Sequence, residues 1–506
     1  MEESTRYNNE VKLPQYVFSK DVNIDSSDNT TTTSEDDNAL PPAGLGWFIT
    51  ALFILGAVVG GGLVALPVAT VNTNLYFSII FIVFMASMAT YTAHVLGQCW
   101  TILQKRWPKY TDHCRKPYPE IARRALGKKW KTAISLCVDI TQFGVAVVYL
   151  LLAAKNIRDL ILMYIQKDIS YCYVVLIVAI CFLPFTFLKS PQDFWAAVVV
   201  GMFTSSISAV LITVGSISDY DTCNPERQLP PTDITNYFLA VGTYMFSYCN
   251  HGAFPTIQHD MKKPGDFTKS VSTAFFFTSI IYITVSVVGY LTYGDSMKHS
   301  VISSLQIDWI QQTVNILITS HCILTLTIVL NPLNQELEDF FNVPHEFGVQ
   351  RMLLRTLTML AVVFVAESVP NFGPLLDLVG GSTMTLTGLV CPCLFYLKLN
   401  ASEVDNKNRD PEEIGLREVL SKNNLQSTII CCSIIVIAVF FAITTTGSAV
   451  YSLSTAQFVV PCYLQPFFGA DKTSGIGAVD CCGHYQNVTR NNEIVCTAAN
   501  FAMYYD

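Results

Sequence analysis

Two apolar stretches of the chain are interrupted by residues that break helices. The first, residues 52–67, is interrupted by three consecutive glycines: Gly60, Gly61 and Gly62. The second, residues 237–261, is interrupted around Asn250 and closed by Pro255. Lipid offers no hydrogen-bond partners, so broken backbone at membrane depth must lie against protein or line a cavity. Paired breaks in two halves of a transport protein mark its substrate site, and the sequence predicts such a site here.

A site of this kind suits a zwitterion, which needs one group for its anion and another for its cation. The start of a half-helix offers free N–H groups and a positive dipole end to a carboxylate. Glycines let a ligand approach that backbone because no Cβ intervenes. Carbonyls at the second break, from Ser247 to Asn250, can accept hydrogen bonds from an ammonium group. The alternative is helix packing, in which Gly56 and Gly60 form a face of small residues.

Side chains that face the predicted cavity would set its selectivity. Six polar or aromatic residues of two apolar segments are candidates: Tyr244, Phe246, Tyr248, Asn250, Gln142 and Tyr149. We expect two or three of them to contact the ligand and the others to pack inside the protein. No lysine or arginine lies near either break in the sequence, which favours a neutral ligand over an acidic one.

Ionisable residues inside apolar segments are costly to bury and are often functional. His251 lies within the second break, and histidine titrates near physiological pH, so it is the first candidate for proton coupling. His321 and Asp139 are further candidates, although each could simply satisfy a hydrogen bond in the interior. Sodium would instead need oxygen ligands, which Thr325 and Thr327 could supply together with backbone carbonyls of the first break.

Composition shows what kind of protein carries these residues. The 506-residue chain is 51% hydrophobic and 14% charged, with a mean hydropathy of +0.39, whereas soluble domains carry about 25% charged residues. Repeated apolar runs of about 20 residues predict an all-α polytopic membrane protein. We expect about eleven transmembrane helices, at residues 46–67, 74–99, 132–157, 171–188, 194–217, 235–256, 269–293, 309–331, 352–370, 374–398 and 427–449.

The termini differ in composition from the apolar part of the chain. Residues 1–43 are rich in Ser, Thr, Asn and acid and carry most of the formal net charge of −8, so we expect a disordered cytoplasmic tail. No basic segment followed by an apolar stretch begins the chain, so no cleaved signal peptide is expected. Residues 44–449 are the predicted transmembrane domain, and residues 450–506 a cysteine-containing extracellular tail.

Basic residues predict the orientation. With a cytoplasmic N-terminus, 24 Lys and Arg residues fall inside and 7 outside. Ten of the 24 inner residues lie in residues 100–131. An odd number of spans then places the C-terminus outside. The sequon at Asn487 agrees, because it suits a glycosylating compartment. Sequons at Asn29 and Asn400 fall on the cytoplasmic side and are expected to stay unmodified.

Cysteines near the predicted outer loops and in the outer tail are candidates for disulfides. They are Cys172, Cys223, Cys462, Cys481, Cys482 and Cys496. Cys172 and Cys223 could form a bridge between two outer loops, and the four tail cysteines allow three pairings that the sequence leaves open. Glu367 is expected near the outer end of the ninth span, in contact with solvent.

Several sequence motifs follow one another in a specific order and spacing. They are VGGGL at 59–63, ALP at 65–67, FSY at 246–248, PTI at 255–257, MKKP at 261–264, NP at 331–332, PNFG at 370–373, LLDLVGGS at 375–382 and CPCLFY at 391–396. Together they resemble the amino acid/auxin permease family over residues 44–448. The resemblance implies eleven spans, the first ten folded as two inverted five-helix repeats of the LeuT-like type, and amino acid transport driven by protons or sodium.

The same resemblance favours one mechanism. The sixth-span pattern is most similar to the proton-linked vesicular inhibitory amino acid branch, and spans nine and ten to the proton-linked plant permeases. We therefore expect proton-coupled symport of a neutral amino acid by alternating access, with sodium coupling as the alternative. A non-transporting amino acid sensor that signals through the long N-terminal tail is the alternative from another class.

The sequence lacks the motifs of several other function classes and partners. No metal-spaced His/Glu set, nucleotide loop or nucleophile motif stands out, so we expect neither an enzyme nor a cofactor, metal or nucleic-acid partner. The expected partners are a small amino acid and the lipid bilayer. The plasma membrane is the expected location, and the tyrosine-based sorting pattern YPEI at 118–121 leaves an endolysosomal membrane open.

Overall fold

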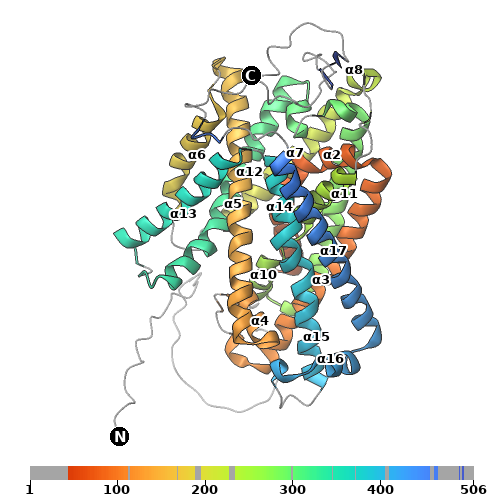
Figure 1. The fold of residues 1–506 in the computed structure, drawn as a ribbon, viewed down its shortest axis with the longest axis vertical. Coiled ribbons are helices and arrows are strands. Elements are labelled where there is room, and N and C mark those ends of the chain that lie inside the picture. Colours follow the sequence, from red (N-terminus) through yellow and green to blue (C-terminus); the bar gives the residue numbers. More distant parts are fainter. Residues whose placement is uncertain are drawn as a thin grey trace, which may run out of the picture. The chain divides into compact units, whose positions relative to one another are not determined.

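The computed structural model describes residues 44–111, 114, 116–167, 169–187, 195–226, 229, 234–297, 300–344, 346–370, 372–404, 410–455, 461–464, 489–490 and 493–494. The predicted acidic tail lies outside the described residues. The same holds for Asn487 and three of the candidate cysteines: Cys481, Cys482 and Cys496. Figure 1 shows the chain as a bundle of helices, and the only strands in the described part are β1 (Thr489–Arg490) and β2 (Glu493–Ile494).

The first predicted span is a broken helix. α1 (Trp47–Val58) and α2 (Gly61–Thr73) are bent by 58° at Val59 and Gly60. Gly60 has φ −148° and ψ −105°, a backbone conformation outside the helical region, so the hydrogen-bond ladder stops there. The predicted interruption at the glycines is therefore present, although the helix continues beyond the predicted end.

Helices cover all the other predicted spans. They are α3 (Leu75–Arg106), α5 (Lys128–Ile165), α6 (Tyr171–Thr186), α7 (Trp195–Ser218), α9 (Ile234–Tyr248), α10 (Phe254–His259), α11 (Phe267–Tyr293), α12 (Asp308–Phe340), α13 (Val349–Ser368), α14 (Phe372–Val379), α15 (Cys391–Val404) and α17 (Leu425–Thr455). Three short helices join them: α4 (Pro117–Leu126), α8 (Tyr220–Cys223) and α16 (Leu416–Lys422).

The all-helical, membrane-spanning fold class is confirmed. Within the described residues, eight helical segments are each long and apolar enough to cross a membrane, or nine with the bent pair α1–α2. α6 is apolar but has only 16 residues, and α9 and α10 are shorter still. The count of eleven spans thus stays a prediction.

The second break lies where the sequence predicts it. α9 ends at Tyr248, a 3-10 turn covers His251–Ala253, and α10 starts at Phe254 with Pro255 in its first turn. Proline lacks the N–H that an internal turn requires, so it is favoured at such a helix start. Both interrupted segments are therefore real helix breaks.

The segment between α14 and α15 contains two π-helical stretches, Gly380–Met384 and Leu386–Val390, which the sequence did not predict. Figure 1 shows α14 beside α5 and α17, which it contacts. π-Helical turns are rare and occur frequently at functional sites. A Cβ on Gly380 would clash with the carbonyl of Gly242 in α9, so glycine is required for this close crossing.

Charged residues cluster at the end of the bundle formed by residues 100–131, which we call the inner end after the predicted orientation. Lys116 forms ion pairs with Glu336 and with Asp339, the latter at 2.8 Å. Glu338, which is fully buried, accepts from Arg351 Nε at 3.0 Å and from Arg355 Nε at 2.6 Å. These pairs fix the end of α12 against α4 and α13.

The opposite, outer end is crosslinked. Cys172 at the start of α6 forms a disulfide with Cys462, so the possible bridge from Cys172 to Cys223 is wrong. Cys223 is itself disulfide-bonded. The reason is that Cys462 lies at the end of α13, where its N–H donates to the Glu367 carbonyl at 2.9 Å. Glu367 is consequently 7% exposed and buried under this crosslink, contrary to the expected contact with solvent.

Candidate functional site

The two helix breaks meet inside the bundle. The Asn250 Nδ2 of the second break donates to the carbonyl of Ala57, in the last turn of α1, at 3.3 Å. The hydroxyl of Tyr282 on α11 lies 3.1 Å from the Val58 carbonyl and 3.4 Å from the Ser247 carbonyl. Carbonyls freed by both breaks therefore share one phenol, and α11 holds the breaks together.

The glycines bring three other helices against the start of α2. A Cβ on Gly60 would clash with His321 Nε2 on α12 and would lie 2.8 Å from the hydroxyl of Tyr149 on α5. A Cβ on Gly61 would lie 3.1 Å from the ring of Phe246 on α9. Only glycine permits this approach, so the role of these glycines goes beyond providing a helix-packing face of small residues.

Gly62 completes the contact with the second break. A Cβ there would clash with Ser247 Oγ and lie 2.7 Å from Ser247 Cβ and 2.9 Å from the Tyr282 hydroxyl. The Gly61 N–H at the start of α2 points to the Tyr149 hydroxyl at 3.5 Å. The N–H groups of the first break are thus surrounded by aromatic, hydroxyl and imidazole side chains of the neighbouring helices.

His321 belongs to this site. Its Nδ1 lies 2.8 Å from Ser205 Oγ on α7, and its Nε2 lies 3.2 Å from Thr325 Oγ1. Its ring centroid is 6.2 Å from that of Tyr149. Thr327 instead donates to the Ile323 carbonyl of its own helix at 3.1 Å. The structure therefore brings His321 and Thr325, but not the Thr327 hydroxyl, towards the glycines.

Several predicted residues point to other helices. The Tyr244 hydroxyl donates to Ser78 on α3 at 2.7 Å, and the Tyr248 hydroxyl lies 3.0 Å from Ser279 on α11. Both tyrosines are fully buried in these contacts. They hold α9 in place rather than surrounding the glycines.

His251 is also directed away from the glycines. Its Nε2 lies 2.9 Å from Thr92 Oγ1 and 3.1 Å from the Ala89 carbonyl, both on α3. Its ring packs 4.8 Å from that of Phe254, and its exposure is 0%. Its ring is therefore a packed element of the α3–α10 contact.

Gln142 and Asp139 lie on α5 nearer the inner end than Tyr149. Gln142 is two turns before Tyr149 on the same helix face, and its buried Oε1 has no hydrogen-bond partner among the described residues. Asp139 lies within electrostatic range of Glu336 and Lys116. Ten residues, or about 15 Å of helix, separate Asp139 from Tyr149. The site at the glycines therefore excludes Asp139.

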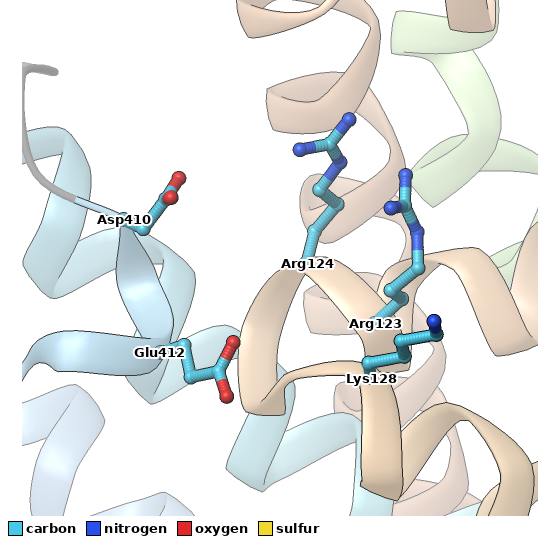
Figure 2. Close-up of a pocket in the computed structure, with 5 residues that line it drawn as sticks. All are labelled: Arg123, Arg124, Lys128, Asp410 and Glu412. Carbon is cyan, nitrogen blue, oxygen red and sulfur yellow. The ribbon is translucent and has the colours of Figure 1, made fainter.

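Figure 2 shows a separate cavity of about 160 Å³ at the inner end. Its lining residues are Arg123, Arg124, Lys128, Asp410 and Glu412. Arg123 is already paired with Glu120 at 2.9 Å, and the Arg124 guanidinium stacks over Trp107 at 4.3 Å. Burial alone would raise the pKa of Glu120, but hydrogen bonds from Lys131, Tyr110 and Arg123 hold it at about 2. This cavity is an ion-paired crevice between α4, α5 and residues 410–412.

The sequence analysis missed three site residues: Tyr282, Ser205 and Gly201. The Gly201 carbonyl lies 3.2 Å from His321 Nδ1. The three residues lie in mainly apolar helices in which Ser, Thr and Tyr residues are spread over several faces, so the sequence does not mark the inward face. Only the spatial meeting of the two breaks identifies them.

Comparison with known proteins matches this architecture. A family model described as transmembrane amino acid transporter protein matches residues 43–446. Amino acid transporter AVT1J of Arabidopsis thaliana is 24% identical over 374 residues, covering 72% of this chain and 85% of the relative. Amino acid transporter AVT1I of the same plant is 23% identical over 368 residues, 70% of this chain and 86% of the relative.

A similar protein of Drosophila melanogaster is named proton-coupled amino acid transporter-like protein pathetic. It is 24% identical over 375 residues, covering 69% of this chain and 76% of the relative. The family consists of membrane amino acid transporters rather than enzymes, in agreement with the sequence analysis. Since the family model spans most of the chain, the protein belongs to the transmembrane amino acid transporter family.

Proposed function

We propose that this protein is a secondary active transporter that carries a neutral amino acid together with protons by alternating access. The observation that carries the proposal is the meeting of the two helix breaks at Gly60–Gly62. Broken helices at the middle of a bundle expose backbone groups that can bind a charged ligand and can be rearranged without unfolding either half.

The groups around the break suggest how an amino acid binds. Its carboxylate would lie at the start of α2, where the N–H groups of Gly61 and Gly62 and the helix dipole favour an anion. Its ammonium would lie near the carbonyls of Val58 and Ser247, beside the Tyr282 hydroxyl. Tyr149, Phe246 and Asn250 would then face the side chain.

Proton coupling is favoured over sodium coupling for two reasons. A similar insect protein carries the words proton-coupled in its name. In addition, an imidazole, His321, lies against Gly60, where a change in its charge would affect a bound carboxylate. His321 is therefore the better placed of the two histidines. Sodium remains the alternative, with Thr325 Oγ1 as its available hydroxyl.

The proposed topology has eleven spans, the first ten in two inverted five-helix repeats, and a cytoplasmic N-terminus. Contacts within the bundle support it. Lys116 and Asp339, both predicted inside, pair with each other, and Cys172 and Cys462, both predicted outside, are bonded. The proposed domain division remains 1–43, 44–449 and 450–506. The plasma membrane is the proposed location, and glycosylation is proposed at Asn487.

The test is current recording in oocytes, with surface expression confirmed, under a panel of amino acids at acidic and neutral pH, with and without sodium. We expect inward current that grows at acidic pH without sodium and is largest for a neutral amino acid. Current that requires sodium and ignores external pH would contradict proton symport. Binding without current or radiolabelled uptake, despite surface expression, would favour the alternative of an amino acid sensor.

A further inference from the structure

Asp377 is an acidic residue inside the apolar bundle that the mechanism above does not use. It lies on α14, just before the π-helical stretches, and is half-buried. One of its carboxyl oxygens, Oδ1, accepts a hydrogen bond from Thr243 Oγ1 on α9 at 2.6 Å. The carboxyl group therefore joins the tenth predicted span to the outer half of the broken sixth span.

The helices packed against α14 bring no compensating charge to this carboxyl group. α14 contacts α9, α17, α5 and the adjoining π-helical segment. α9, α17 and the π-helical stretches contain no Asp, Glu, Lys, Arg or His. A neutral carboxylic acid is tolerated in such surroundings, whereas an ionised one without a partner costs much more.

The titratable groups of these helices also lie elsewhere. Tyr244 on α9 is bonded to Ser78 on α3. On α17, the residue at this crossing is Thr445, which packs against Gly242 and Gly381. Tyr451 lies almost two turns farther along the same helix.

The remaining titratable positions of α17 and α9 also lie more than a turn from this crossing: Tyr237, Tyr248, Cys431 and Cys432. On α5, Gly144 contacts Val379, so Asp139 is more than a turn away towards the inner end and Lys155 three turns away towards the outer end. Within the described residues, Asp377 thus has Thr243 as its hydrogen-bond partner, and no charged side chain of the packed helices lies within a turn of this crossing.

A short hydrogen-bonded path connects Asp377 to the glycine break. Thr243 donates its hydroxyl to Asp377, and its carbonyl accepts from Ser247 Oγ at 2.7 Å. Ser247 in turn packs against Gly62, where its Oγ would meet an added Cβ. One turn of α9 therefore separates the carboxyl group from the proposed substrate site.

The backbones of α9 and α14 approach each other closely where the two helices cross. A Cβ on Gly242 would lie 2.5 Å from the Asp377 carbonyl, so the two backbones nearly touch. The hydroxyl of Thr445, which lies in the same crossing, has no hydrogen-bond partner among the described residues.

We propose that Asp377 carries the proton that is transported with the amino acid. This inference rests on the proposed proton symport. In the outward-facing state the carboxylate takes a proton from outer water; in the inward-facing state the acid returns the proton to cytosolic water. Proton binding weakens the bond from Thr243 because a neutral acid is a poorer acceptor than a carboxylate, and α9 is then free to move relative to α14.

The experiment uses the full-length protein reconstituted in liposomes without a membrane potential. The probe is radiolabelled L-alanine, or the neutral amino acid with the largest current in the panel. Two quantities are measured: exchange of the amino acid at equal pH, and its steady-state accumulation under a gradient of one pH unit. A one-to-one symporter accumulates its substrate about tenfold under that gradient, since one pH unit equals about 1.4 kcal/mol.

For Asp377→Asn we expect exchange to persist and accumulation to fall to a ratio near one, because the amide binds substrate but no proton. Asp377→Glu should restore accumulation. His251→Asn is the matched control, a second buried titratable side chain, and should accumulate as the wild type does. A merely structural role of Asp377 would reduce exchange and accumulation together.

Two results would overturn the proposal: about tenfold accumulation by Asp377→Asn, or loss of both activities in a folded variant. If Asp377→Asn does not fold, Thr243→Val decides. It keeps the carboxyl group but removes its donor, so the pH of half-maximal uptake should move, and an unchanged profile would refute the link. Failure of the wild type to accumulate under a pH gradient would instead remove the proposed proton symport, and Asp377 with it.

Discussion

Replacing Gly62 with alanine tests whether the contact between the two helix breaks sustains transport. The new Cβ would clash with Ser247 Oγ and lie 2.7 Å from Ser247 Cβ. Carbon atoms prefer separations of about 3.5–4.0 Å, so α2 and α9 must move apart by about 1 Å. Displacing a binding group by that much can lower a rate about 10²-fold. We expect a loss of this order in the initial rate of amino acid uptake, normalised to surface expression.

A second substitution separates this effect from general damage. Ser247→Gly removes both clashing atoms, so the double variant Gly62→Ala/Ser247→Gly should recover most of the uptake of Ser247→Gly alone. The Tyr282 hydroxyl, 2.9 Å from the new methyl group, keeps the recovery from being complete. Gly447→Ala on α17 is the control, since nothing lies within 4 Å of its added Cβ. Normal uptake by Gly62→Ala, or a double variant no better than Gly62→Ala, would refute the reasoning.

Three further predictions concern other contacts. Tyr282→Phe removes the hydroxyl shared by the Val58 and Ser247 carbonyls; at about 1–2 kcal/mol for two hydrogen bonds, uptake should fall about five- to thirtyfold, and unchanged uptake would show that the bridge is dispensable. Glu338→Ala removes the buried carboxylate that pairs with Arg351 and Arg355, so the thermal stability of the purified protein should drop by the equivalent of about 3–5 kcal/mol. Asp339→Ala, at a half-exposed pair, is the control and should cost far less. The Glu120 pKa of about 2 lies below its usual value of about 4.5, so this carboxylate stabilises the fold above pH 4.5 and loses that effect as the pH falls towards 2. The difference in melting temperature between wild type and Glu120→Gln should therefore be largest near pH 7 and shrink below pH 4.5, and a difference independent of pH would contradict the assigned ionisation.

The sequence predicted the helix breaks because glycine and proline act locally. A triple glycine weakens a helix through its conformational freedom, and a proline lacks the N–H of an internal turn, so Gly60–Gly62 and Pro255 could be read directly. Pro67, Pro184 and Pro332 nevertheless lie inside helices. The apolar runs predicted the helices for the same reason. Tyr149 and Phe246, two of the expected cavity side chains, lie against Gly60 and Gly61, and their contact with a substrate stays a prediction.

The inward faces of the helices could not be predicted. In a membrane, an apolar side chain is compatible with both lipid and interior, so a uniformly apolar helix does not reveal its orientation. His251 was therefore preferred over His321 on its position in the break, although its ring points to α3. Asp377 was overlooked as a chemical group because it sits inside a motif that identifies the family.

The partner of Cys172 and the burial of Glu367 depend on the path of the chain after α17. Nothing local to Cys172 distinguishes Cys462, which is 290 residues away, from Cys223. Long-range pairings of this kind are set by the tertiary fold, and sequence spacing does not encode them.

The disulfide between Cys172 and Cys462 also restricts the transport cycle. A covalent bond keeps the start of α6 and the chain segment after α17 together in every state, and the hydrogen bond from Cys462 to Glu367 adds the end of α13. These three outer ends can therefore only travel as one body. In the proposed alternating-access cycle, opening and closing of the outer side would then come from helices outside this body, such as α1, α2 and α9, which are broken or closely crossed.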